Sequence, residues 1–294
     1  MLSAQLLRQV RRLHLYARRL ALGRLGGAYH SAFKGAGLTF EEVREYQPGD
    51  DVRSIDWNVT ARMGRPFIKR FVEERETTVL VLMDVSASLG FGSSGQSKRR
   101  AGAEIGALFA LCAAVNHDRV GAVLGTTDVE RYIPPAKGNR HLQRLLRDLL
   151  AYEPVQRGTD LNPLLQWVLR TQRRRAIVVL ISDFLTDNYA PAFLRVAYRH
   201  DLIAVHLIDP WEQSCPPVGL AWLEDAETGQ QKLVDCNDRR VRFEFEQQRK
   251  RFVDRLYRLA AQAEADVITV QTTGGHIQAV AQFLRQREQQ GRRR

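Results

Sequence analysis

With 294 residues, 44% of them hydrophobic and 26% charged, the chain has the composition of an ordinary globular protein, which excludes a fibrous repeat and wholesale disorder. The net charge of +11 resides at the two ends, since residues 1–40 carry +7 and residues 285–294 carry +4, so sequence-specific nucleic-acid recognition by the neutral body is disfavoured. The three cysteines fit neither a disulfide framework nor a zinc module, and no apolar run is long enough to cross a bilayer, so we expect a cytoplasmic protein.

Residues 1–37 are predicted to form a basic amphipathic helix and a glycine-rich joint. Apolar residues recur at helical spacing over residues 6–22, with arginines between them. This helix either packs on the body with a solvated cationic face or docks on an anionic membrane surface. Any membrane contact is therefore expected to be peripheral and to use residues 6–22.

Residues 38–76 are predicted to be β-rich, with short strands and turns. The clearest turn is Pro48-Gly49-Asp50-Asp51. The segment is dense in opposite charges, which is typical of a solvated ion-pair surface. It could form a small all-β subdomain that either buttresses the main domain or exposes a surface to a partner.

Residues 77–287 alternate between strand and helix patterns, which predicts an α/β fold: a mostly parallel sheet with helices on both faces. Apolar runs place buried strands at 78–83, 120–124, 176–181, 202–208 and 267–270, and periodicity places helices at 98–116, 139–151, 161–174, 189–199, 239–263 and 276–287. Residues 129–133 follow a strand too closely for a crossover, so they should pair antiparallel at an edge. Residues 219–236 resemble an inserted hairpin, and residues 288–294 form a basic tail.

Oxygen-bearing side chains follow the strands at one edge of this predicted sheet. The first strand ends in Asp84, Ser86 and Ser88, which alternate and so point the same way. Asp183 follows a second strand, and Thr159 precedes a helix. Ligands of open α/β sheets bind beyond the carboxyl ends of the strands. These five residues are therefore the candidate site.

Two carboxylates and three hydroxyls match the preference of Mg²⁺ or Mn²⁺ for oxygen ligands. Because two carboxylates only just neutralise a dication, the bound ion would remain open to an incoming carboxylate. A plainer interpretation also exists, since Thr159 or Asp160 could simply cap the following helix.

The pattern Asp84-x-Ser86-x-Ser88, Thr159 and Asp183 resembles the metal-ion-dependent adhesion site of von Willebrand factor A domains. In that family the hydroxyls and aspartates surround Mg²⁺, directly or through water, and an acidic residue of a partner completes the coordination. The resemblance implies a von Willebrand factor A-like, Rossmann-type fold for residues 77–287. It carries over to these positions only, and the adjacent Asp160 stays unassigned.

A second resemblance covers residues 22–287. Residues 42–57 read EVREYQPGDDVRSIDW, and Thr60-Ala61-Arg62 and residues 69–74 (KRFVEE) continue the pattern. These motifs are similar to the hallmark of the bacterial domain-of-unknown-function family 58. Members of that family are typically linked with MoxR-type AAA ATPases, which implies a chaperone-like or complex-maturation role.

The sequence therefore favours a noncatalytic, metal-dependent adaptor that binds a MoxR-type ATPase and a client protein presenting an acidic residue. A Mg²⁺-dependent phosphoesterase is the alternative enzyme. It is disfavoured because the chain lacks a P-loop and a Gly-x-Ser-x-Gly elbow, and Ser86 stands where a second carboxylate would be needed. A third hypothesis is nonspecific nucleic-acid binding through the arginine tails.

Overall fold

The computed structural model describes residues 29, 32–33, 38–73, 77–93, 95–214 and 216–291. The helix predicted at residues 6–22, most of the glycine-rich joint and the last three arginines lie outside the described residues. The chain divides into two compact units: Phe33–Thr77 forms one, and the rest of the chain forms the other.

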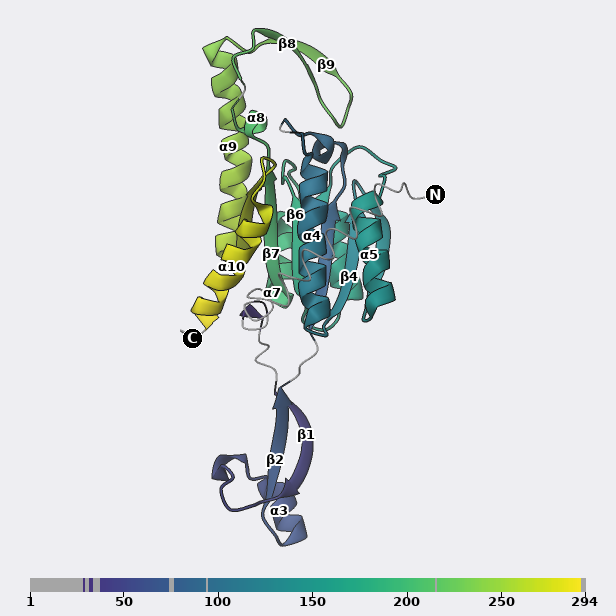
Figure 1. Cartoon of the computed structure of the whole chain (residues 1–294). Helices are drawn as coiled ribbons and strands as arrows, with labels where there is room; N and C mark the ends of the chain where they lie inside the picture. The colour runs from purple at the N-terminus through teal and green to yellow at the C-terminus, as the bar shows by residue number, and fades with distance from the viewer. Residues whose placement is uncertain are drawn as a thin grey trace. The chain divides into compact units, whose positions relative to one another are not determined.

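The smaller unit is a two-stranded antiparallel sheet, with β1 Leu38–Glu45 paired to β2 Phe67–Glu73 (Figure 1). Its connection holds the 3-10 helix η1 Val52–Ser54 and the α-helix α3 Trp57–Met63. The all-β interpretation of this segment is therefore wrong. Helix α3 forms because the Asp56 carboxylate accepts hydrogen bonds from the first free backbone N–H groups, and it ends at Gly64, whose φ is 69°.

The larger unit is built on a six-stranded sheet in the order β10-β7-β6-β3-β4-β5. Its strands are β3 Thr78–Asp84, β4 Arg119–Gly125, β5 Val129–Ala136, β6 Ile177–Ser182, β7 Asp201–Ile208 and β10 Asp266–Gln271. All neighbours are parallel except β4 and β5. The predicted α/β class and the predicted antiparallel edge strand are thus confirmed.

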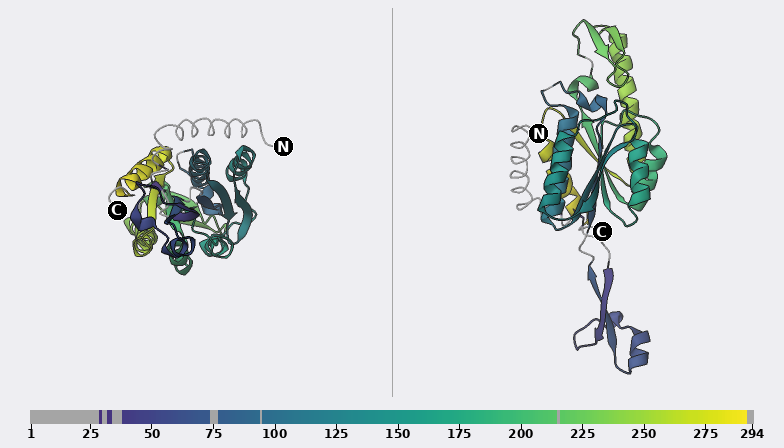
Figure 2. Two further views of the ribbon diagram at one scale, coloured as in Figure 1. Left: turned by 90° about the horizontal axis from the view of Figure 1, so that it is seen from below. Right: turned by 90° about the vertical axis from the view of Figure 1, so that its right-hand side faces the viewer.

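Helices cover both faces of this sheet (Figure 2). One face carries α4 Lys98–Val115, α5 Asn139–Ala151 and α10 His276–Gly291, and the other carries α6 Leu161–Thr171, α7 Ala190–Arg199 and α9 Arg239–Gln262. Two short helices, η2 Ala87–Gly90 and α8 Pro210–Gln213, follow β3 and β7. Helix α10 continues to Gly291, past the predicted end at residue 287.

The four central strands are buried on both faces, which is why each appears in the sequence as a continuous apolar run. Helix α4 lies close to the sheet because it presents glycine there. A Cβ added at Gly102 would lie 3.0 Å from both Ile181 Cγ2 and Leu207 Cδ1. A larger side chain at this position would push the helix away from the sheet.

A β-hairpin is inserted between α8 and α9, as predicted. It consists of β8 Leu220–Glu224 and β9 Gln231–Asp235, paired antiparallel. Figure 1 shows the hairpin beyond the carboxyl ends of the strands, next to the first turns of α9. No helix among the described residues is long and apolar enough to cross a membrane.

Candidate functional site

Two buried carboxylates lie at the carboxyl edge of the central sheet. β3 ends at Asp84, and Asp183 directly follows the last residue of β6. The two strands are parallel neighbours, with Met83 opposite Ile181. Asp84 and Asp183 are each only 1% exposed. The fold therefore brings the two predicted aspartates to one place.

Serine side chains connect these carboxylates. Asp84 Oδ1 accepts the backbone N–H of Ser86 at 2.9 Å, and the hydroxyls of Ser86 and Ser88 lie 3.2 Å apart. Ser88 Oγ then donates to Asp183 Oδ2 at 3.0 Å. Ser182, which was not among the predicted residues, donates to Asp84 Oδ2 at 2.7 Å. Four of the five predicted site residues thus form one hydrogen-bonded cluster.

The fifth residue, Thr159, lies in a loop that is hydrogen-bonded to the loop after β3 and to the loop after β6. The N–H of Ala87 donates to the carbonyl of Arg157 at 2.9 Å, and Thr186 Oγ1 donates to the carbonyl of Thr159 at 3.3 Å. The Thr159 hydroxyl itself donates to Glu227, at the tip of the β8–β9 hairpin. Thr159 is therefore beside the cluster, but its side chain is engaged elsewhere.

Helix α6 is capped by Asp160 and not by Thr159, the other residue that the sequence offers for this position. Asp160 Oδ1 accepts the N–H of Asn162 at 2.8 Å. The capping function therefore belongs to Asp160. The Thr159 hydroxyl is not used for capping.

A buried lysine contacts the site, and sequence reasoning missed it. Lys98, the first residue of α4, has 0% exposure and places Nζ 2.7 Å from Asp183 Oδ2 and 2.6 Å from Glu212 Oε1. Arg249 on α9 pairs with the other Glu212 oxygen at 3.0 Å. With Asp84 included, the ionised cluster has three carboxylates and two cations, and hence one net negative charge.

The pKa values of the two aspartates are shifted in opposite directions. Burial, reinforced by the nearby charge of Asp183, raises the pKa of Asp84 to about 7. Burial alone would also raise the pKa of Asp183, but the ammonium of Lys98 holds it below its ordinary value. Asp183 is therefore an anion with a partner. Asp84 is a carboxylate whose charge lacks an equivalent cation in the described part of the chain.

Among the described residues, no three His, Cys, Asp or Glu side chains gather in a metal-binding group. Any ion held at this edge would therefore depend on hydroxyl oxygens in addition to the carboxylates of Asp84 and Asp183. That donor set excludes an arrangement typical of zinc and leaves one suited to a hard cation.

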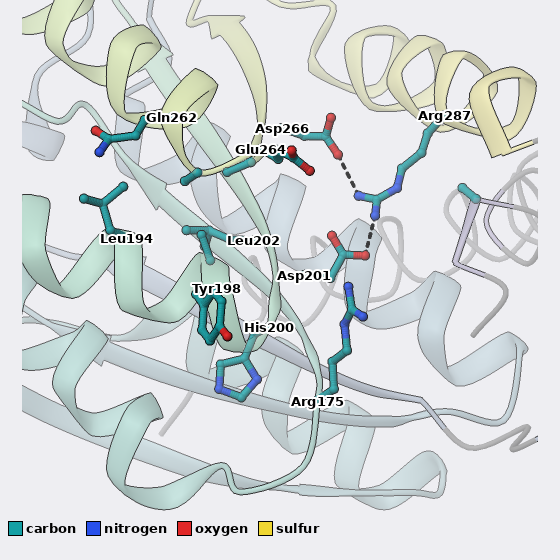
Figure 3. A pocket seen from close by; sticks show the side chains of 14 residues that line it. Arg175, Leu194, Tyr198, His200, Asp201, Leu202, Gln262, Glu264, Asp266 and Arg287 are labelled. Atoms are coloured by element: carbon teal, nitrogen blue, oxygen red, sulfur yellow. Dashed lines mark hydrogen bonds and ion pairs between the residues drawn. The ribbon is translucent and has the colours of Figure 1, made fainter. Parts of the chain in front are cut away.

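A pocket of about 1060 Å³ lies at the opposite edge of the sheet, where β7 and β10 begin (Figure 3). Asp201 and Asp266, the first residues of these strands, both pair with Arg287 of α10, and the Arg287–Asp266 distance is 2.7 Å. Arg287 is one of the cations that give residues 285–294 their positive charge. Because it is held in two ion pairs, it is not free to bind a phosphate backbone.

In the hallmark segment, residues 42–57, three aspartates stabilise local structure. Asp50 pairs with Arg44 at 2.7 Å and accepts the N–H of Gln47, while Asp51 caps η1 and Asp56 caps α3. Trp57, by contrast, is 68% exposed. Its aromatic surface is therefore not used to pack this small unit.

Residues 42–253 match the family model described as "Protein of unknown function DUF58". The chain belongs to this family. The match contains the hallmark segment, the candidate site and the hairpin, and it confirms the resemblance inferred from the hallmark.

Three relatives of this DUF58 protein are named only as uncharacterized proteins. Mb1516 of Mycobacterium bovis and Rv1480 of Mycobacterium tuberculosis are each 33% identical over 223 residues, which is 75% of this chain and 70% of theirs. YeaD of Bacillus subtilis is 28% identical over 152 residues, covering 50% of this chain and 34% of its own.

Two solved structures are distantly similar. BatB from Bacteroides thetaiotaomicron has 13% identity and a TM-score of 0.47, covering 74% of this chain and 100% of its own. An aerotolerance-related membrane protein from Bacteroides fragilis has 14% identity and a TM-score of 0.48, covering 73% and 99%.

Proposed function

We propose that this DUF58 protein is a noncatalytic adaptor that binds Mg²⁺ or Mn²⁺ through Asp84, Ser86, Ser88, Thr159 and Asp183 and thereby holds partner proteins. One observation carries the proposal. Two buried aspartates from different strands converge, with two serine hydroxyls between them, closely enough for the charge of Asp183 to raise the pKa of Asp84. A carboxylate in that situation gains from a nearby cation.

The residues present fit a hard dication. Every candidate donor is an oxygen atom, as Mg²⁺ and Mn²⁺ prefer. The cluster carries one net negative charge when ionised, because Lys98 and Arg249 offset only two of its three carboxylates. Lys98 departs from the all-oxygen pattern. Among the described residues, the other oxygen of Asp183, Oδ1, accepts only the N–H of Leu185 at 3.3 Å.

When bound, the ion would supply a positive centre that can accept a carboxylate from another protein. The chain's own contribution is to hold the donors: Asp84 through Ser86 and Ser182, and Asp183 through Ser88 and Lys98. Donors held in advance lose little conformational freedom on binding. This supports capture of an ion at the site.

The proposal also includes the finer features that the sequence resemblances imply. These are a von Willebrand factor A-like, Rossmann-type fold, a MoxR-type AAA ATPase and an acidic client as partners, and a cytoplasmic location. The family match contains the hallmark on which the ATPase link rests, while the fold detail rests on the pattern of Asp84, Ser86 and Ser88 and the location on the cysteine content.

The test is affinity purification of the full chain from its native cells, in Mg²⁺ or in a chelator, beside Asp84→Ala and Asp187→Ala. Asp187 is an exposed aspartate four residues after Asp183 and serves as the charge-matched control. We expect an AAA ATPase to be retained in Mg²⁺ by the wild type and the control, and lost with Asp84→Ala or the chelator. If the ATPase is retained equally well by Asp84→Ala and in the chelator, the proposal is contradicted.

A further inference from the structure

The β8–β9 hairpin buries little of itself against the rest of its unit. Most residues of both strands are exposed, and Trp222 is 68% exposed. Its base is tied by backbone bonds, including Cys236 N–H to the carbonyl of Gly219 at 2.8 Å. Apolar burial therefore does not determine where the hairpin tip lies, and individual polar contacts at the tip carry unusual weight.

The tip itself is an ordered turn. Asp225 Oδ1 accepts the N–H groups of Glu227 at 2.9 Å and Thr228 at 3.2 Å, and the carbonyl of Asp225 accepts Gly229 N–H at 2.7 Å. Gly229 adopts a left-handed φ of 70°, which closes the turn. This conformation determines the direction in which Glu227 projects.

Glu227 projects onto the candidate site. Its carboxylate accepts the hydroxyl hydrogen of Thr159, a residue 68 positions away in the chain. Arg157 lies against the same turn, with Nη1 3.8 Å from where a Cβ at Gly229 would be. The hairpin thus delivers a carboxylate of this chain to the one candidate donor that the aspartate and serine cluster does not engage.

We infer that Glu227 is a built-in competitor for the candidate site: while it holds Thr159, the hairpin covers the edge of the sheet that an acidic residue of a partner would approach. This inference rests on the proposed function. Release of Glu227 would free Thr159 and open the edge, so the hairpin regulates access to the site.

The two ends of the hairpin are anchored while its tip is releasable. Glu212 of α8 precedes the hairpin and Arg249 of α9 follows it, and both belong to the ion-pair cluster around Lys98. The flanking helices are therefore tied to the site through partly buried charges that pair directly or indirectly with the buried Lys98. Opening can then occur at the tip without displacement of α8 or α9.

The test compares the full-length wild type with Glu227→Ala and with Glu224→Ala, an exposed glutamate of the same hairpin that contacts only Gln231 among the described residues. The first readout is hydrogen exchange of the hairpin amides without metal. Since a hydrogen bond to a charged acceptor is lost, we expect about tenfold faster exchange in Glu227→Ala, and wild-type exchange in Glu224→Ala.

The second readout is water-proton relaxation by Mn²⁺ bound to each protein. We expect stronger relaxation with Glu227→Ala than with the wild type or Glu224→Ala, because water reaches the ion more freely. If Mn²⁺ binds the wild type through Asp84 but Glu227→Ala changes neither readout, the inference is wrong and the proposed function stands. If Mn²⁺ binds no variant, the proposed function fails, and the competitor role fails with it.

Discussion

Lys98 is the residue that most changes the electrostatics of the candidate site. Its ammonium is fully buried between Asp183 and Glu212. A lysine in the first turn of a helix faces the positive end of the helix dipole, so its presence there is a hint of an acidic partner. The sequence could not identify that partner, because Asp183 and Glu212 lie 85 and 114 positions away.

Lys98→Met should destabilise the protein by about 3 to 5 kcal/mol, since it leaves the buried carboxylate of Asp183 without its cation. Denaturant unfolding measures this loss. Arg100→Met, an exposed change on the same helix, should cost less than about 1 kcal/mol. A Lys98→Met protein as stable as Arg100→Met would show that the buried ammonium is not needed for folding.

Asp84 should make the metal-free protein less stable as pH rises. Because folding raises the pKa of this carboxyl from 3.8 to about 7, the folded state binds more protons than the unfolded state within that window. The free energy of unfolding should therefore fall between pH 4 and 7 and level off above. Other groups also titrate, so the comparison is with Asp84→Asn, which should lack this component.

Urea unfolding in a chelator at about pH 5 and about pH 8 gives the comparison. Asp84→Asn should gain stability relative to the wild type on going to the higher pH. Equal pH dependence in the two proteins would mean that burial does not shift the pKa of Asp84. The same proton would compete with a metal ion, so affinity for Mn²⁺ should weaken below pH 7.

At the scale of elements, apolar runs and periodic patterns predicted the described strands and long helices of the larger unit to within a few residues. They did so because strands buried on both faces appear as short continuous apolar runs, whereas amphipathic helices repeat their apolar residues about every 3.6 positions. Helix α3 was missed since it has only seven residues and depends on the Asp56 cap. The contact of the hairpin tip with Thr159 was also not predictable, because it joins two loops distant in sequence.

The close packing of α4 on the sheet gives a prediction at this scale. Gly102→Val should destabilise the protein by about 1 to 3 kcal/mol, because even a Cβ would press on Ile181 and Leu207. Thermal and denaturant unfolding measure the change. Arg100→Val places the same side chain on the exposed part of the helix and should have a much smaller effect. Equal effects of the two changes would show that packing against Ile181 and Leu207 does not set the cost.

At the scale of the whole molecule, the alternation of strands and helices is enough to predict that Asp84, Ser86, Ser88 and Asp183 lie at one edge of the sheet. That inference succeeded because the carboxyl ends of parallel strands meet at the same edge. What it could not supply was the set of groups that arrive from other segments, namely Lys98, Glu212 and Glu227. Lys98 and Glu212 contribute to the charge of the site, and Glu227 is the residue that we propose controls access to it.

The central claim is that this edge of the sheet binds a hard dication. Calorimetric titration of Mg²⁺ into the full chain, repeated with Asp84→Ala and Asp187→Ala, tests it most directly. We expect one ion to bind the wild type and Asp187→Ala, and none to bind Asp84→Ala. A wild type that takes up no Mg²⁺, or an Asp84→Ala protein that binds it equally well, would contradict the claim.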